Sequence, residues 1–312
     1  MIHEIEIFLP STNKKNQLHV VIWEPKDTPV KCILQLSHGM IDHIYRYKEF
    51  ASYLAARGVL VIGNDHLGHG KTVKSSEEFG YFDAEDGSKT VVDDLHTVTR
   101  YAKEKYPNLP YFLLGHSMGS FIARRYLMTY GKELDGAIIM ATGQFPVPLV
   151  NIGLPILQIL KKLKGSHYRS KLLNKLVFSS FNKQFKPTQT EYDWLSKNKA
   201  SIDAYRADPL CNYIFTLNGY ETLLRSFDFI GRKSNIRRIP KNLPIFFVVG
   251  SEDPLSQNGK IVTKIFHQYK ALGIQNIKLN LYPSDRHELL QELDRHTIFE
   301  EIYGWIIHEM KH

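Results

Sequence analysis

The fold of this chain is decided at residues 111–119, which read YFLLGHSMG. The apolar run ends in a G-x-S-x-G pentapeptide, a pattern typical of a sharp turn from a buried strand into a helix, with a strained serine at the turn. At the positive end of that helix, backbone N–H groups can stabilise an oxyanion. Ser117 is therefore the first candidate for a nucleophile.

Strand-like runs alternate with helical patterns along the chain. The predicted strands fall at 4–10, 18–23, 32–37, 59–63, 111–114, 137–141, 245–249 and 277–282, and the predicted helices at 48–56, 89–105, 121–130, 259–272 and 295–309. The first two strands alternate in polarity, as in an antiparallel hairpin at a sheet edge, whereas the later ones are continuously apolar, as in parallel strands buried on both faces. We predict an α/β fold with a mostly parallel, eight-stranded sheet flanked by helices.

One long segment interrupts this alternation. After the strand at 137–141, the next begins only near Ile245, about a hundred residues later, which is far longer than an ordinary crossover. We predict a helical cap at 144–215, inserted between a first core part at 1–143 and a second at 216–312. A helix near 217–229 returns the chain to the core.

The excess of positive over negative charge in this chain falls in the predicted cap. The net charge is +8, and no acidic residue lies between Asp135 and Glu191. The cations of that interval are Lys161, Lys162, Lys164, Arg169, Lys171, Lys175, Lys183 and Lys186. These eight equal the net charge, so the rest of the chain is near neutral, and nucleic-acid binding is not expected.

Two more polar residues follow predicted strands. The strand at 245–249 leads to Asp253, and the strand at 277–282 leads to His287. Because the carboxyl ends of parallel strands meet at one edge of a sheet, we expect both side chains near Ser117. Serine, acid and histidine in this order are typical of an α/β-hydrolase triad, in which the histidine is the general base and the acid orients it.

Other residues compete for the acid and base roles. Glu252 and Asp285 are alternative acids, but the turn marked by Pro254 favours Asp253. His267 and His296 fall inside predicted helices, whereas His287 follows a strand.

The turn after the strand at 32–37 supplies a second oxyanion donor. Gly39 permits close approach of the backbone, so the N–H groups of Met40 and Met118 form the predicted oxyanion hole. The run DHLGHG at 65–70 contains candidate metal ligands, but no further ligands cluster with it and its glycines suit a loop-shaping role. We predict no metal site there.

These motifs together resemble the monoacylglycerol lipase and lysophospholipase branch of the α/β-hydrolases, which is related to the serine aminopeptidase-like group. The matching stretches are SHGM at 37–40 with RY at 46–47, DHLGHG at 65–70, GHSMG at 115–119, GSED at 250–253 and RHE at 286–288. The resemblance covers the core from about residue 30 onward and matches the cap weakly. It implies an α/β-hydrolase fold, a structural loop at 65–70, no metal, no organic cofactor, the triad Ser117, Asp253 and His287, and the oxyanion hole of Met40 and Met118.

Two residues depart from the family pattern. Ser120 stands where the family often has another glycine, and Asp42 stands where its oxyanion loop often has glutamate. Neither belongs to the triad, but both are close enough in sequence to the site to reshape the pocket.

The cap sequence indicates a lid over the site. Apolar residues recur at near-helical spacing between 149 and 163, and the basic stretch that follows is also amphipathic. The favoured interpretation is a lid packed on the core with a solvated, charged face; the alternative is a lid that also docks on anionic lipid. The predicted substrate contacts are Gly39, His116, Leu149, Ile152 and Ile156.

We predict a serine hydrolase that cleaves carboxylic esters through an acyl-enzyme, with monoacylglycerols or lysophospholipids as substrates. The first rival is an amidase or aminopeptidase with the same triad, which would need an acidic pocket; the cap acids that could form one are Glu191, Asp193, Asp203 and Asp208. The second rival is a non-enzymatic ligand-binding protein on the same scaffold. The sequence leaves the acyl length, head group and oligomeric state open.

The remaining sequence features concern the compartment. No stretch approaches the roughly 20 apolar residues of a membrane span, and the first residues lack the pattern of a secretory signal. The only cysteines are Cys32, in a predicted core strand, and Cys211. We therefore expect no disulfide and a cytoplasmic protein, with peripheral membrane contact through the basic cap as a further hypothesis.

Overall fold

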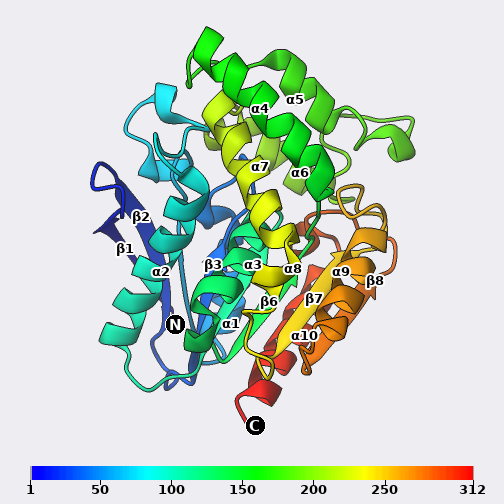
Figure 1. Cartoon of the computed structure of the whole chain (residues 1–312). Helices are drawn as coiled ribbons and strands as arrows, with labels where there is room; N and C mark the ends of the chain where they lie inside the picture. The colour runs from blue at the N-terminus through cyan, green and yellow to red at the C-terminus, as the bar shows by residue number, and fades with distance from the viewer. Residues whose placement is uncertain (1, 312) are drawn as a thin grey trace.

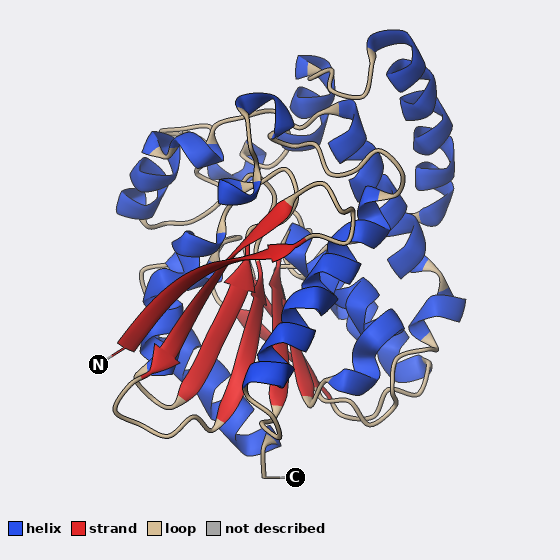
Figure 2. Ribbon diagram, turned by 90° about the vertical axis from the view of Figure 1, so that its left-hand side faces the viewer, coloured by secondary structure: helices blue, strands red, loops and turns tan. Residues whose placement is uncertain are grey.

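The computed structural model describes residues 2–311, and their eight strands form one sheet (Figures 1 and 2). The strands are β1 (Ile2–Pro10), β2 (Gln17–Pro25), β3 (Cys32–Ser37), β4 (Val59–Asn64), β5 (Tyr111–His116), β6 (Gly136–Met140), β7 (Ile245–Gly250) and β8 (Ile277–Tyr282). Their order is β1-β2-β4-β3-β5-β6-β7-β8. β2 pairs antiparallel with β1 and β4, and all later pairings are parallel. The predicted architecture and its edge hairpin are confirmed.

Helices cover both faces of the sheet. The core helices are α1 (Lys48–Ala55), α2 (Gly87–Lys105), α3 (Met118–Tyr130), α7 (Leu217–Gly231), α8 (Lys233–Ile236), α9 (Lys260–Ala271) and α10 (Arg295–Glu309). Buried side chains of α2, α3, α7 and α9 form one apolar cluster with the sheet. Those of α1 and α10 form a second cluster on the other face, where Phe50 and Phe299 lie 5.0 Å apart.

The central strands supply both clusters because side chains alternate between the faces of a sheet. In β5, Leu113 belongs to the α3 side and Leu114 to the α1 side; in β7, Phe247 and Phe246 divide in the same way. Full burial of each such side chain stabilises the fold by about 1.5–3 kcal/mol. This is why the strand sequences lack the polar positions of a half-exposed strand.

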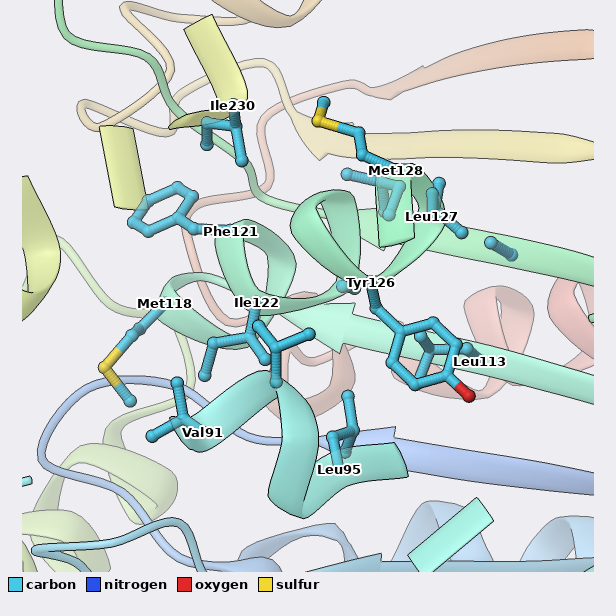
Figure 3. Close-up of a cluster of buried hydrophobic side chains, with 14 of the residues drawn as sticks. Val91, Leu95, Leu113, Met118, Phe121, Ile122, Tyr126, Leu127, Met128 and Ile230 are labelled. Atoms are coloured by element: carbon cyan, nitrogen blue, oxygen red, sulfur yellow. The ribbon is translucent and has the colours of Figure 1, made fainter. Parts of the chain in front are cut away.

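Helix α3 lies in the α2/α7 layer and carries the residue after the nucleophile candidate at its start. In Figure 3, Phe121 and Ile122 of α3 lie among side chains from α2, the sheet and the α7 region, including Val91, Leu113 and Ile230. The helix begins at Met118, three residues before the predicted start at 121. The prediction placed the start too late because a glycine near a helix start weakens the local helical signal.

The edge strand β8 differs from its prediction. It pairs only with β7, and only its last residue, Tyr282, is buried; the others are half-buried or exposed, with Leu281 43% exposed. The expectation of burial on both faces was wrong for this strand, because a strand at the end of the sheet order has no neighbour on one side.

The segment predicted as the cap contains α4 (Val147–Lys164), α5 (Lys171–Phe178) and α6 (Lys199–Ala207). A short loop joins α4 to α5, and a longer loop that includes the 3-10 helix Lys183–Phe185 joins α5 to α6. These helices lie beyond the carboxyl ends of the parallel strands, at the top of Figure 1, and α4 packs along α7. The division of the chain at 143/144 and 215/216 remains a prediction. Within residues 2–311, no helix is both long and apolar enough to cross a membrane.

Candidate active site

Ser117 occupies a strained turn between β5 and α3. Its backbone angles are φ 53° and ψ −119°, and its N–H donates to the Met140 carbonyl oxygen at 3.1 Å. A Cβ atom on Gly115 would lie 2.3 Å from the Gly119 oxygen, and one on Gly119 would lie 1.9 Å from the Ser37 oxygen. Only glycine fits at either position, so the surrounding backbone holds the serine in this conformation.

The structure brings the three predicted triad residues together. His287 Nε2 lies 2.8 Å from Ser117 Oγ, and His287 Nδ1 lies 3.0 Å from Asp253 Oδ1. Asp253 is fully buried, and the same Oδ1 accepts the N–H of Leu255 at 2.9 Å. Because Nδ1 faces a carboxylate, it carries the ring proton, and Nε2 is left to accept the serine proton.

The competing acids have other partners. Asp285 Oδ1 accepts from Lys197 Nζ at 2.7 Å, and burial raises the pKa of Asp285 although Lys197 opposes the effect. Glu252 lies 3.9 Å from Arg286 and points toward solvent. The competing histidines, 267 and 296, are both exposed.

The predicted oxyanion donors lie on either side of the serine. Gly39 lies against the nucleophile, since a Cβ atom there would be 3.4 Å from Ser117 Cβ. The N–H of Met40 has no acceptor among residues 2–311. Met118 is the first residue of α3, and the first N–H groups of a helix have no acceptor within it. Both N–H groups are therefore free to bind an oxyanion.

A buried ionic clamp links the oxyanion loop to the histidine loop. Arg46 donates to Asp42 Oδ1 at 3.0 Å and, through both Nη atoms, to the two oxygens of Glu288 at 2.7 Å each. Burial raises the pKa of Asp42, but Arg46 together with the surrounding histidines outweighs this and holds it well below its usual range. Glu288 directly follows His287, so the clamp fixes the distance between base and oxyanion donors. Sequence reasoning missed it because the pairing residues are 242 positions apart.

His116 is held between the same two loops. Its Nδ1 lies 2.9 Å from Tyr47 Oη, and its Nε2 lies 3.2 Å from the His287 carbonyl oxygen. Burial, followed by the charge of His287, lowers the pKa of His116 to about 4, so the ring is neutral near pH 7 and carries one N–H. Because a carbonyl oxygen can only accept, the ring proton belongs on Nε2, which donates to His287. Nδ1 then faces the Tyr47 hydroxyl, which also lies 2.9 Å from Asp42 Oδ2.

A cavity of about 1710 Å³ separates cap and core above Ser117 and His287. Its apolar lining comes from α3, α4, α5 and α7 and includes Phe121, Leu149, Ile156, Leu157, Leu160, Leu173, Leu223, Leu224 and Phe227. Of the predicted substrate contacts, Gly39, His116, Leu149 and Ile156 line the cavity. Ile152 does not. It is 61% exposed, because on a helix it is turned about 60° from Leu149 toward solvent.

The cap acids are mostly engaged elsewhere. Glu191 lines the cavity, but the other three candidates of the acidic pocket do not. Asp193 accepts two backbone N–H groups, at 189 and 190; Asp203 pairs with Lys199 at 3.0 Å, and Asp208 with His43 at 2.8 Å.

The exposed surface of α4 and α5 carries apolar side chains beside the cations of the favoured interpretation, which itself stays a prediction. Its exposed apolar residues, each between 55% and 73% exposed, are Leu149, Ile152, Ile156, Ile159 and Leu163 of α4 and Leu172 and Leu176 of α5. Of these, Leu149, Ile156 and Leu176 also line the cavity. Lys161 instead points inward and pairs with Glu221 of α7. The helical spacing was right, but the apolar stripe is wide enough to line the cavity and face solvent together.

The loop at 65–70 is held by hydrogen bonds. The Asp65 carboxylate accepts from His19 Nδ1 and from the N–H groups of Ile44 and Lys71, each at 2.8 Å. Burial raises the pKa of Asp65, but His19, His38 and the Ile44 N–H together outweigh this and lower it. The carboxylate joins three separate segments, an arrangement that suits a structural role.

Comparison with known proteins agrees with this geometry. A family profile described as serine aminopeptidase, S33, matches residues 28–294. The chain is 30% identical to the monoglyceride lipase of Homo sapiens, over 91% of this chain and 84% of that protein. It is 27% identical to the monoglyceride lipase homolog of Monkeypox virus, over 93% and 94%. A thermostable carboxyl esterase from Bacillus coagulans, solved in complex with glycerol, superposes with a TM-score of 0.91 at 27% identity, over 99% of this chain and 100% of that one.

Proposed function

The chain belongs to the serine aminopeptidase, S33 family of α/β-hydrolases, and from this premise we propose that it hydrolyses monoacylglycerols and related single-chain acyl esters. One observation carries the proposal: the hydrogen-bonded series Ser117–His287–Asp253 lies beside a large, mostly apolar cavity. A serine relay supplies the chemistry, and the cavity has room for an acyl chain.

Acylation begins with the proton of Ser117. His287 Nε2 takes this proton while Oγ attacks the ester carbonyl carbon, and the carbonyl oxygen becomes an oxyanion held by the N–H groups of Met40 and Met118. Each such donor is worth about 3–4 kcal/mol of transition-state stabilisation. The tetrahedral intermediate then breaks its bond to the alcohol, which takes the proton from His287 and leaves as glycerol. Asp253 stabilises the imidazolium throughout.

Deacylation repeats these steps with water. His287 takes a proton from water, the resulting nucleophile attacks the acyl carbon, and the same two N–H groups hold the oxyanion. When the intermediate collapses, Ser117 leaves with the proton from His287, and the fatty acid departs. The free enzyme is regenerated without any further reactant.

The cavity favours esters of long acyl chains over peptides. An aminopeptidase needs uncompensated acids to hold a protonated amino terminus. Of the acids that line the cavity, Asp42 and Glu288 both bind the guanidinium of Arg46, which leaves Glu191 as the acid outside this ionic cluster. The apolar lining instead matches an acyl chain, at about 25 cal/mol for each Å² that it removes from water.

A substrate panel tests this proposal. We expect kcat/KM to rise along p-nitrophenyl esters from acetyl to longer chains and to be high for monoacylglycerol. Lysophosphatidylcholine in the same panel identifies the tolerated head group. Aminoacyl-p-nitroanilides serve as the alternative substrates, and faster turnover of these amides than of any ester would overturn the assignment.

We also propose that the cap contacts lipid surfaces. The exposed apolar face of α4 and α5 suits insertion among acyl chains, and the exposed cations Lys162, Lys164, Lys171 and Lys175 lie on the same two helices. Such a face binds membranes through apolar burial together with attraction to anionic lipids. Contact there would bring the cavity close to its substrate.

Vesicle co-sedimentation separates the two contributions. Replacing Ile152 and Ile159 with glutamate should lower recovery with both neutral and anionic vesicles. The control is Leu293→Glu, because Leu293 is equally exposed but lies on the core. Salt should weaken only the preference for anionic vesicles. Equal recovery of the parent, the variant with both glutamates and Leu293→Glu would refute cap docking.

A further inference from the structure

Cap and core meet at a second polar cluster, outside the triad. It consists of His43, which follows the oxyanion loop, and of Asp208 and Cys211, which lie after α6 in the cap. One ligand atom from each residue lies within 4.8 Å of the others, and His43 Nε2 is 2.8 Å from Asp208 Oδ2. His43 and Cys211 are buried, and Asp208 is partly exposed.

The three donor atoms suit a borderline-soft cation. Imidazole nitrogen, carboxylate oxygen and thiolate sulfur are the common protein ligands of Zn²⁺. Around a tetrahedral Zn²⁺ such atoms lie roughly 3.3–3.8 Å apart, as bond lengths of about 2.0–2.3 Å require. A three-ligand site therefore needs the sulfur to approach by up to about 1 Å and His43 Nε2 to separate from Asp208 Oδ2 by about 0.5 Å. The two buried ligands are already removed from water.

Charge and access also favour a cation. Burial opposes a charge on the Cys211 sulfur, and the charged groups that act on it most strongly are the carboxylates of Asp42, Asp208 and Glu288 and the guanidinium of Arg46. The local charge is therefore negative. Asp42 and Cys211 line the large cavity, so an ion can reach the cluster from that side and keep a water as its fourth ligand.

We propose that His43, Asp208 and Cys211 bind one Zn²⁺ ion, and that the bound ion slows ester hydrolysis. The thiol proton leaves to solvent when sulfur joins the metal, and the hydrogen bond between His43 and Asp208 is replaced by two metal bonds. The ion would tie the cap to the residue next to Asp42, whose carboxylate accepts the N–H of Gly39 at 3.1 Å. Oxyanion loop and cap then lose the freedom to adjust to a substrate.

Binding can be measured without reference to activity. After treatment with a chelator and its removal, equilibrium dialysis should show one Zn²⁺ per chain. Co²⁺ should give a thiolate-to-cobalt charge-transfer band that disappears in Cys211→Ser, which retains the other cysteine, Cys32. The Asp208→Asn variant should bind Zn²⁺ at least about 10-fold more weakly. The matched control is Asp203→Asn, a neighbouring exposed acid, which should bind as the parent does.

Activity provides the second measurement. Zn²⁺ should inhibit hydrolysis of a p-nitrophenyl ester at the concentrations that saturate binding, EDTA should reverse the effect, and Mg²⁺, which prefers oxygen ligands, should have none. Circular dichroism checks that each variant folds. A charge-transfer band that survives in Cys211→Ser, or equal Zn²⁺ affinity in parent and Asp208→Asn, would overturn the site. Inhibition of Cys211→Ser as strong as that of the parent would overturn the link to hydrolysis. Labelling of Ser117 by a fluorophosphonate is independent of each of these results.

Discussion

At the residue scale, the site depends on backbone contacts that only glycine permits. Ser117 has a positive φ, which costs a non-glycine residue of order 1–3 kcal/mol, so neighbouring contacts must hold it there. Gly115 and Gly119 allow the backbones of β5, α3 and the end of β3 to approach more closely than any side chain at these positions would permit. The pentapeptide is therefore a packing requirement as much as a chemical one.

Gly119→Ala tests this requirement. The added methyl group would meet the Ser37 carbonyl oxygen at 1.9 Å, and backbone cannot move aside as a flexible side chain can. We expect a loss of more than about 3 kcal/mol in the free energy of unfolding, together with loss of activity. The control is Gly304→Ala in α10, where nothing lies within 4 Å; it should gain about 0.5–1 kcal/mol. Urea unfolding measures the free energy of unfolding of both variants. Equal values for Gly119→Ala and Gly304→Ala would contradict the packing argument.

The clamp between Arg46 and Glu288 gives a second prediction at this scale. Glu288→Ala removes two charge-assisted hydrogen bonds from a buried guanidinium that keeps Asp42 as its carboxylate partner, so we expect a loss of about 1.5–3 kcal/mol in stability. Because Glu288 positions the histidine loop against the oxyanion loop, kcat should fall about 10-fold with KM little changed, a smaller effect than removal of an oxyanion donor.

The control for the clamp is an exposed pair. Glu104→Gln removes a partner of Arg100 at 3.9 Å, where both side chains are mostly in water, and should change neither stability nor kcat measurably. If Glu288→Ala lowers stability but leaves kcat intact, the clamp has only a structural role.

At the element scale, the sheet could be predicted and the surroundings of the site only in part. Strand ends are visible as apolar runs, so Ser117, Asp253 and His287 could be assigned to one edge of the sheet. Side chains that pair across long separations, as in the clamp and the His43 cluster, leave no local pattern. Nor does helical spacing say which apolar stripe faces inward, and this is why Ile152 was placed in the pocket.

One helix contact predicts a pH dependence of stability. Asp94 of α2 accepts the N–H of Thr12 at 2.7 Å and the hydroxyl of Ser11 at 2.9 Å, and so ties the β1–β2 turn to the helix. Burial raises the pKa of Asp94 from its ordinary value of 3.8 to about 6. A carboxyl whose pKa is higher in the folded than in the unfolded protein stabilises the fold in its protonated form. This contribution is complete below the unfolded pKa and is lost as the pH rises through the folded pKa.

Asp94→Asn isolates this contribution. Between about pH 4 and about pH 7, the parent should lose up to about 3 kcal/mol of stability relative to the variant, the value that corresponds to the raised pKa. Urea unfolding of both proteins at the two pH values measures the difference. A constant difference at both would show that the folded carboxyl titrates normally.

At the scale of the whole molecule, function depends on the space between cap and core. The relay belongs to the core, whereas much of the apolar lining belongs to α4, α5 and α7, so substrate choice and chemistry are supplied by different parts of the chain. Adjacent positions on α4 can test this, because Leu160 lines the cavity and Ile159 does not.

Leu160→Trp should narrow the cavity and spare the relay. We expect kcat/KM for a long-chain ester to fall at least about 10-fold relative to the acetyl ester, since a few lost methylene contacts are worth that much. Ile159→Trp adds the same bulk to the outer face and should leave the ratio unchanged. Assays on soluble esters without detergent or vesicles avoid any effect of the outer face on lipid binding. An equal ratio of long-chain to acetyl kcat/KM in the two variants would show that the acyl chain binds elsewhere.

The central claim is that Ser117 carries the acyl group, and mass spectrometry of the labelled protein tests it most directly. The parent enzyme treated with a fluorophosphonate should carry one adduct, on the peptide that contains Ser117, and the Ser117→Ala variant should carry none and hydrolyse no ester. An adduct on another residue, or undiminished turnover by Ser117→Ala, would contradict the account.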